Sequence, residues 1–158
     1  MIGRALWKSE RVVDLQAFGF GDRVERPGHG IAPEYSLHVQ CRWRIVRDGL
    51  MLVGSADIFW PPEGSEVSYR DFDYDGRRSR RDELIDGFML HGERAHIVNR
   101  AQGASTGDAQ VALNDGCVLE LWPDHRSGVE ADGPSEYWRF FRAGADTHLV
   151  VTASGTET

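Results

Sequence analysis

The sequence has little cysteine and no long apolar run, and both shortages exclude whole classes of protein. Its two cysteines, Cys41 and Cys117, lie far apart without C-x-x-C spacing, which argues against a disulfide framework and a zinc knuckle. We expect both to be small buried thiols. No stretch approaches the roughly 20 apolar residues of a membrane span, and the first eight residues lack the apolar segment of a signal peptide. A cytoplasmic protein without a membrane partner is therefore expected.

Lysine is almost missing, because the chain has one lysine, Lys8, and seventeen arginines, a bias typical of GC-rich bacterial coding. The formal net charge is −7, and residues 108–136 hold seven acids with Arg126 as their single basic residue. A phosphate backbone is repelled by such a surface, so no nucleic-acid partner is expected. A basic protein partner, in contrast, would be attracted to it.

Strand patterns dominate the chain. With 158 residues, 41% of them hydrophobic, the chain suffices for one core, and we predict a single domain over residues 1–158. Apolar and polar residues alternate strictly from residue 35 to residue 45, and Asp48-Gly49 then predicts a tight turn. Residues 35–53 are therefore expected to form a central antiparallel hairpin with Trp43 buried. Further strands are predicted over residues 11–18 and 95–98. Two more hairpins are predicted, one over residues 109–122 with its turn at Asn114-Asp115-Gly116 and one formed by residues 136–142 and 147–152.

The middle of the chain differs from both β-rich halves. Residues 61–81 are polar and charged, which predicts a long loop between the halves. One helix is predicted near residues 80–91, where apolar residues recur at helical spacing behind acids in the first turn. The fold class expected is mostly β (α+β), with antiparallel hairpins forming a sandwich or an open barrel.

A pattern like that of a calcium-binding loop precedes this predicted helix. Asp71, Asp73 and Asp75 alternate before Gly76, and Asp82 stands at the twelfth position, as in loops whose carboxylates converge on one hard cation. Against a metal site, no helix precedes the loop, the last acid is not Glu, and arginines crowd the segment. A solvated Asp/Arg loop that caps the helix is the alternative.

A second candidate site is the polar face of the predicted strand. His38, Gln40, Arg42 and Arg44 are spaced two residues apart, so they would line one side of a strand. Arginine binds carboxylate or phosphate through paired bonds, and histidine adds a donor or a base. The alternative is an ordinary solvent-facing side of an antiparallel strand.

No catalytic residues are predicted, and an enzyme is the least favoured class of function because no nucleophile-base pair is visible. The sequence around Ser55 lacks the second glycine of a nucleophile elbow, and Cys41 falls on the apolar face. His91, His96, His125 and His148 show no metal-ligand spacing, and we interpret them as surface or capping residues.

Four stretches carry a resemblance to a known family. These are residues 37–44 (LHVQCRWR), 81–83 (RDE), 119–124 (LELWPD) and 136–141 (EYWRFF). In them the chain resembles a family of uncharacterised bacterial proteins, mainly from actinobacteria. That resemblance implies no activity, ligand or catalytic residue.

Two functional hypotheses follow. The first is a non-catalytic protein-interaction module of immunity or accessory type, whose acidic surface binds an unknown protein partner. The second is a small-anion or metal-ion binding protein that uses the face from His38 to Arg44 or the loop from Asp71 to Asp82. Because hairpins leave sheet edges, a homodimer is also expected.

Overall fold

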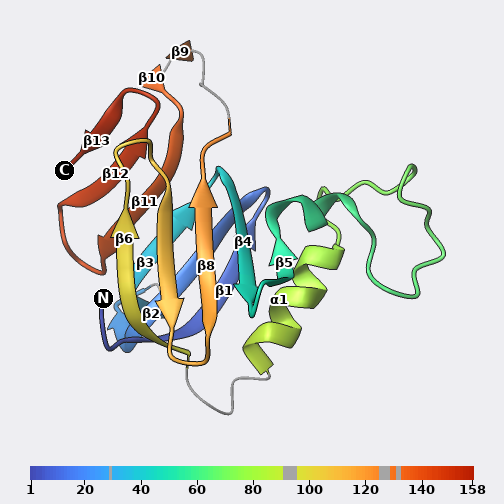
Figure 1. Ribbon diagram of the computed structural model, residues 1–158, viewed down its shortest axis with the longest axis horizontal. Helices are drawn as coiled ribbons and strands as arrows, with labels where there is room; N and C mark the ends of the chain where they lie inside the picture. The colour runs from blue at the N-terminus through green and yellow to red at the C-terminus, as the bar shows by residue number, and fades with distance from the viewer. Residues whose placement is uncertain (29, 91–95, 125–128, 131–132) are drawn as a thin grey trace.

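The computed structural model describes residues 1–28, 30–90, 96–124, 129–130 and 133–158 (Figure 1). Its strands are β1 (Ala5–Val12), β2 (Leu15–Arg26), β3 (Gly30–Val39), β4 (Arg42–Arg47), β5 (Leu50–Gly54), β6 (His96–Gly103), β7 (Ala109–Leu113), β8 (Cys117–Trp122), β9 (Val129–Glu130), β10 (Gly133–Pro134), β11 (Glu136–Arg142), β12 (His148–Thr152) and β13 (Gly155–Glu157). The helices are η1 (Ser55–Phe59) and α1 (Arg80–Leu90). No helix among these residues is long and apolar enough to cross a membrane.

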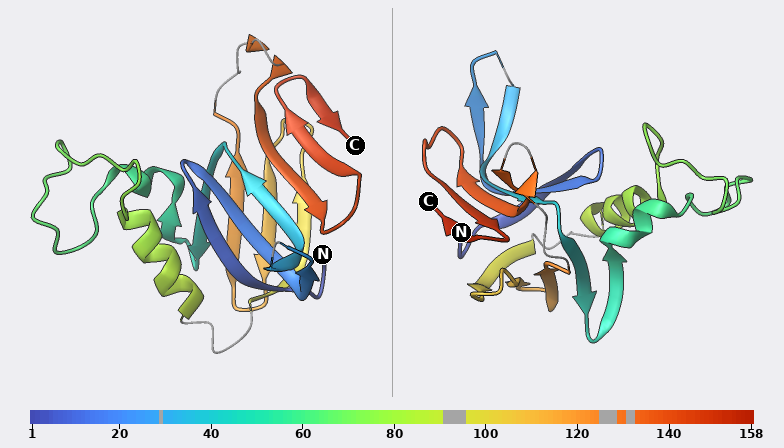
Figure 2. Two further views of the ribbon diagram at one scale, coloured as in Figure 1. Left: turned by 180° about the vertical axis from the view of Figure 1, so that it is seen from behind. Right: turned by 90° about the horizontal axis from the view of Figure 1, so that it is seen from above.

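Eleven strands form one open antiparallel sheet, in the order β13-β12-β11-β3-β2-β1-β6-β7-β8-β4-β5. Figures 1 and 2 show the sheet folded into two facing layers, with β13 to β1 in one and β6 to β5 in the other. The predicted mostly β fold is confirmed, and the sheet does not close into a barrel. Strands from before and after the long loop lie side by side in it, because β3 pairs with β11 and β4 pairs with β8.

The core lies between the two layers. Phe18 of β2 meets Trp43 of β4 edge to face, with ring centroids 5.2 Å apart, and both side chains are fully buried. Helix α1 closes the open end beside β5 by burying Ile85 and Phe88 against the same cluster. Large aromatic side chains therefore join the layers, as the prediction for Trp43 required.

The predicted central hairpin is wrong in its connectivity. Residues 35–45 form two strands, because β3 ends at Val39 and β4 begins at Arg42 in the opposite layer. At the break, the backbone N–H groups of Gln40 and Cys41 both donate to the carbonyl of Tyr137, at 2.9 and 3.0 Å. Alternating burial continues across the break, which is why the sequence looked like one strand. The actual hairpin is β4–β5, at the sheet edge.

The first predicted strand is also corrected. Residues 11–18 contain a turn, in which Val13 adopts a φ of 57° and joins β1 to β2. Because a β-branched residue rarely takes this left-handed conformation, no residue pattern there predicted a turn. Other predicted turns are confirmed, including Asp48-Gly49, where both residues have positive φ as a tight primed turn demands.

The predicted loop and helix are both observed. Residues 60–79 contain no regular helix or strand and project beyond α1 (Figure 1). Asp82, in the first turn of α1, caps the start of this helix. Its Oδ2 accepts hydrogen bonds from the backbone N–H and the Oγ of Ser79, at 2.7 and 2.8 Å. Side-chain acceptors of this kind satisfy backbone donors that a helix start leaves open.

Candidate functional site

The structure separates the four residues of the predicted polar face. His38 lies on β3, between β2 and β11, whereas Arg42 and Arg44 lie on β4 in the other layer. Arg42 pairs with Asp124 at 2.9 Å and Arg44 pairs with Glu120 at 2.6 Å. Gln40 is exposed in the connection between the strands. The four side chains therefore do not line one site. Arg42 and Arg44 border other cavities, where both are paired with acids, and His38 borders a groove on the opposite layer.

Three of the four acids in the calcium-like loop already have protein partners. Asp71 accepts from the hydroxyl of Ser68, and Asp73 accepts from the backbone N–H of Asp75. Asp82 forms a 2.8 Å ion pair with Arg11. Within the described parts of the chain, no group of three or more His, Cys, Asp or Glu side chains is placed to hold a metal ion. The metal site stays a prediction from the sequence.

Arginines and other polar groups engage the acidic stretch as well. Residues 108–136 contain five acids with described side chains. Asp115, Glu120, Asp124 and Glu136 form ion pairs with Arg47, Arg44, Arg42 and Arg139, and Asp108 accepts from Thr106. A paired carboxylate attracts a distant cation less than an isolated one does. The described part of this stretch thus offers little uncompensated negative charge.

A groove of about 450 Å³ crosses the outer side of the layer that contains β1, β2, β3, β11 and β12. Small side chains make its floor, because Ala17, Gly19 and Ser36 come from adjacent strands and face away from the core. Gly19 is required there, since a Cβ would lie 2.8 Å from Pro33 and 3.1 Å from the Lys8 side chain. The groove exists here because these three short side chains leave the space above the strands unfilled.

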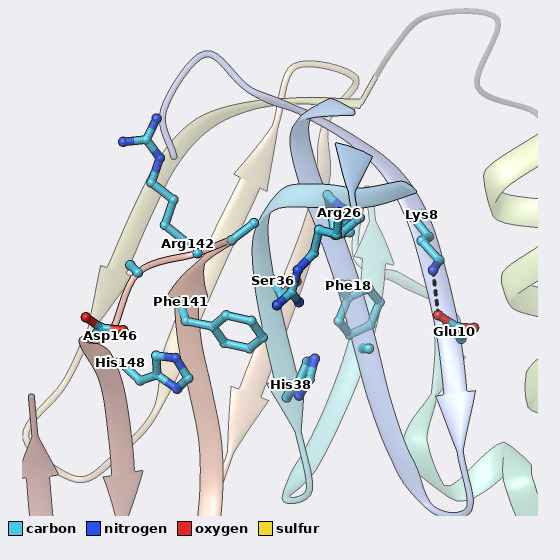
Figure 3. A pocket seen from close by; sticks show the side chains of 17 residues that line it. Lys8, Glu10, Phe18, Arg26, Ser36, His38, Phe141, Arg142, Asp146 and His148 are labelled. Atoms are coloured by element: carbon cyan, nitrogen blue, oxygen red, sulfur yellow. Dashed lines mark ion pairs between the residues drawn. The ribbon is translucent and has the colours of Figure 1, made fainter. Parts of the chain in front are cut away.

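A bend in the β2–β3 hairpin supplies one end of the groove. The strand register shifts between Phe20 and Arg23, and beyond this bulge the hairpin stands away from the sheet (Figure 2). Bulges redirect strands in this way. Arg26 is thereby carried over the floor, and Figure 3 shows its guanidinium beside Ser36. Among the described residues no acidic side chain pairs with Arg26.

Aromatic side chains form one wall and a lysine the other (Figure 3). The ring of Phe141 is stacked with His148 at a centroid distance of 4.6 Å, and it meets His38 edge to face at 4.9 Å. Across the floor, Lys8 forms a 2.7 Å ion pair with Glu10. Arg142 also lines the groove, but in Figure 3 its side chain extends away from the floor.

The electrostatics of the groove depend on His38. Partial burial lowers the pKa of His38 below its usual value, with Arg139 and His148 lowering it further and Glu136 opposing them. His38 is therefore neutral at pH 7, and one ring nitrogen donates while the other accepts. An anion bound nearby would favour the charged imidazolium, so anion binding and proton uptake at His38 are coupled.

Neither cysteine is available as a nucleophile at neutral pH. Burial raises the pKa of Cys41 to about 12, and burial also raises the pKa of Cys117. Both thiols are free and buried, which confirms the prediction made for them. Thiols in this state are protonated and unreactive.

Of the two roles predicted for His96, surface or capping, the surface role is wrong, and its Nε2 lies 3.3 Å from the carbonyl of Phe88 in the last turn of α1. This side chain is 4% exposed, stacks on Phe88 of α1 with ring centroids 4.2 Å apart, and lies 2.8 Å from Asp115 through Nδ1. It connects the helix to the β7–β8 turn and is a structural residue. His91 and His125 lie outside the described residues, whereas His148 is half-buried in the wall of the groove.

Sequence reasoning missed most of the groove. Of the residues that line it, the sequence pattern singled out His38 as a candidate and gave His148 only a surface or capping role. The alternation of β11 does place Phe141 opposite to the buried Trp138, but only the pairing of β11 with β3 brings it to His38. Comparison of the chain with protein-family models, curated proteins and solved structures finds no match.

Proposed function

We propose that the protein is a non-catalytic binding protein for a small organic anion, held in the groove between Lys8 and Phe141. The observation that carries this proposal is the guanidinium of Arg26, which lies over a floor of small side chains without a carboxylate partner among the described residues. A cavity of about 450 Å³ is within the usual range for ligand sites of roughly 300–1,000 Å³.

The groove favours a flat acid over a bulky one. Arg26 provides the planar, paired donors that bind carboxylate or phosphate. Ala17, Gly19 and Ser36 leave room for a ring against the floor, and Phe141 offers an aromatic edge or face beside it. This arrangement supports the anion-binding hypothesis. Of the four residues predicted on the strand face, His38 belongs to the proposed site, and Arg26 is a residue that the prediction did not include.

Calorimetric titration with benzoate and with inorganic phosphate at pH 6 tests the proposal. Arg26→Gln should weaken binding at least about tenfold, because hydrogen bonds to charged groups contribute roughly 1.5–3 kcal/mol. Arg100→Gln is the matched control, since Arg100 is an exposed arginine on β6 in the other layer. Absence of saturable binding of either anion, or equal losses in both variants, would contradict the proposal.

The pH dependence gives a second readout. Because burial lowers the pKa of His38 in the free protein, the side chain becomes a cation only when the pH falls through that lowered pKa. Affinity for benzoate should therefore rise as the pH falls, and His38→Asn should reduce that rise. An unchanged pH profile in His38→Asn would remove His38 from the site while leaving the role of Arg26 intact.

A further inference from the structure

An apolar crevice lies between the two layers of the sheet. It is bordered by the inner side of the layer whose outer side carries the anion groove. Its volume is about 280 Å³, and it is distinct from the anion groove because its walls come from the inward-facing residues. Leu37, Trp138, Phe140 and Leu149 line one side, and Ala101, Gly103, Ala109 and Val111 line the other.

The topology keeps this crevice open. β6 pairs with β1 at His96 and Ile97, and Val98 still exchanges backbone hydrogen bonds with Gly3 and Arg4. From Arg100 to Gly103 the described pairing of β6 is with β7. Beyond the other end of β6, Trp138 donates through Nε1 to the carbonyl of Gly107, in the turn to β7, at 2.7 Å. The layers are thus joined near both ends of β6, and the crevice lies along the strand between these two joins.

The lining chemistry selects the ligand. None of the lining side chains is charged, and the indole of Trp138 is already satisfied by Gly107. Gln102 and Gln110 contribute backbone, because their side chains bond each other on the opposite face, where Gln110 also donates to Glu120. An ionic or strongly polar group inside would lose its hydration without compensation.

We propose that this crevice binds an alkyl chain. Small residues on β6 and β7 face large apolar residues on β3, β11 and β12, so its walls are almost entirely carbon. A volume of about 280 Å³ holds roughly nine non-hydrogen atoms, if each occupies about the 30 Å³ of a liquid water molecule. Alkyl groups gain free energy from leaving water in proportion to the area that they bury.

A series of neutral alcohols tests the proposal without engaging the anion groove. In calorimetric titrations, affinity should increase about fourfold for each methylene from hexanol to octanol, the factor that corresponds to complete burial. It should then level off between decanol and dodecanol, once the crevice is full. No saturable binding, or an increase that continues unchanged through dodecanol, would overturn the proposal.

Two substitutions on neighbouring residues locate the site. Ala101→Trp fills the mouth of the crevice and should weaken octanol binding at least tenfold, whereas Arg100→Trp, on the outer face of β6, should change it less than twofold. Ala109→Leu is a smaller filling substitution if Ala101→Trp does not fold. Arg26→Gln should leave octanol binding unchanged, which separates this site from the groove. Equal losses in the filling variants and in Arg100→Trp would overturn the assignment.

Discussion

Replacement of Asp115 by alanine should be one of the most destabilising changes outside the apolar core. Its Oδ2 lies 2.8 Å from His96 Nδ1 and 3.1 Å from Arg47 Nη2, and its Oδ1 accepts from the backbone N–H of Cys117 at 3.1 Å. The carboxylate is thus shared by β4, β6 and the β7–β8 turn. Through His96, which stacks on Phe88, it also positions helix α1.

The magnitude follows from burial. A buried donor that is left without its acceptor costs roughly 1–3 kcal/mol, and the substitution leaves both the His96 ring and the N–H of Cys117 in this state. His96 is 4% exposed and the Asp115 side chain 14%, but Arg47 is 42% exposed and recovers water. We therefore expect a loss of about 3 kcal/mol in the free energy of unfolding. In a domain of this size the melting temperature should fall by about 6–12 °C.

The loss should depend on pH. Burial opposes ionisation of Asp115, but hydrogen bonds from Cys117 and interaction with His96 outweigh it, and the pKa of Asp115 is lowered. A carboxyl with a lowered folded-state pKa stabilises the protein above its unfolded pKa, near 4, and this contribution is lost as the pH falls through the folded value. The gap between wild type and Asp115→Ala should therefore be full at pH 7 and shrink below about pH 4.

Urea denaturation at pH 7 and pH 3.5 measures both effects. Asp86→Asn is the control, because Asp86 pairs with Arg78 in a bridge whose side chains are both more than half exposed, and such a bridge contributes less than about 1 kcal/mol. If Asp115→Ala costs no more than the control at pH 7, the carboxylate does not hold β4, β6 and the turn together.

Two further predictions follow from the core and the sheet edge. Trp43→Ala should lower the free energy of unfolding, measured in urea, by about 3–5 kcal/mol, because it opens a cavity between the layers beside Phe18. Trp60 is half-exposed, so Trp60→Ala should lower it by less than about 1 kcal/mol, and similar values for both variants would contradict this packing. β5 is an edge strand without a charged residue, and Leu50 on it is 70% exposed, so we expect two chains to pair at this edge. Light scattering should give twice the 17.7 kDa chain mass for the wild type and a single chain mass for Leu50→Lys, and a monomeric wild type would contradict the pairing.

Local sequence was sufficient wherever a short segment defines its own geometry. The turn at Asp48-Gly49 needs positive φ at both positions, which these two residues accept readily. Alternating polarity identified the buried side of β3 and β4, because successive strand residues face opposite sides whatever the neighbouring strand is. The helix start was visible in Asp82, whose acceptor position three residues beyond Ser79 is a local property.

Tertiary structure alone decided which segments meet. Nothing within residues 35–45 distinguishes one strand from two strands in different layers, since the break at Gln40 depends on the carbonyl of Tyr137 almost a hundred residues away. The groove likewise needs β11 beside β3, which places Phe141 next to His38, and a hairpin bend that carries Arg26 over Ser36. Strand neighbours and register are chosen by how both layers pack together, and a single segment carries no record of that choice.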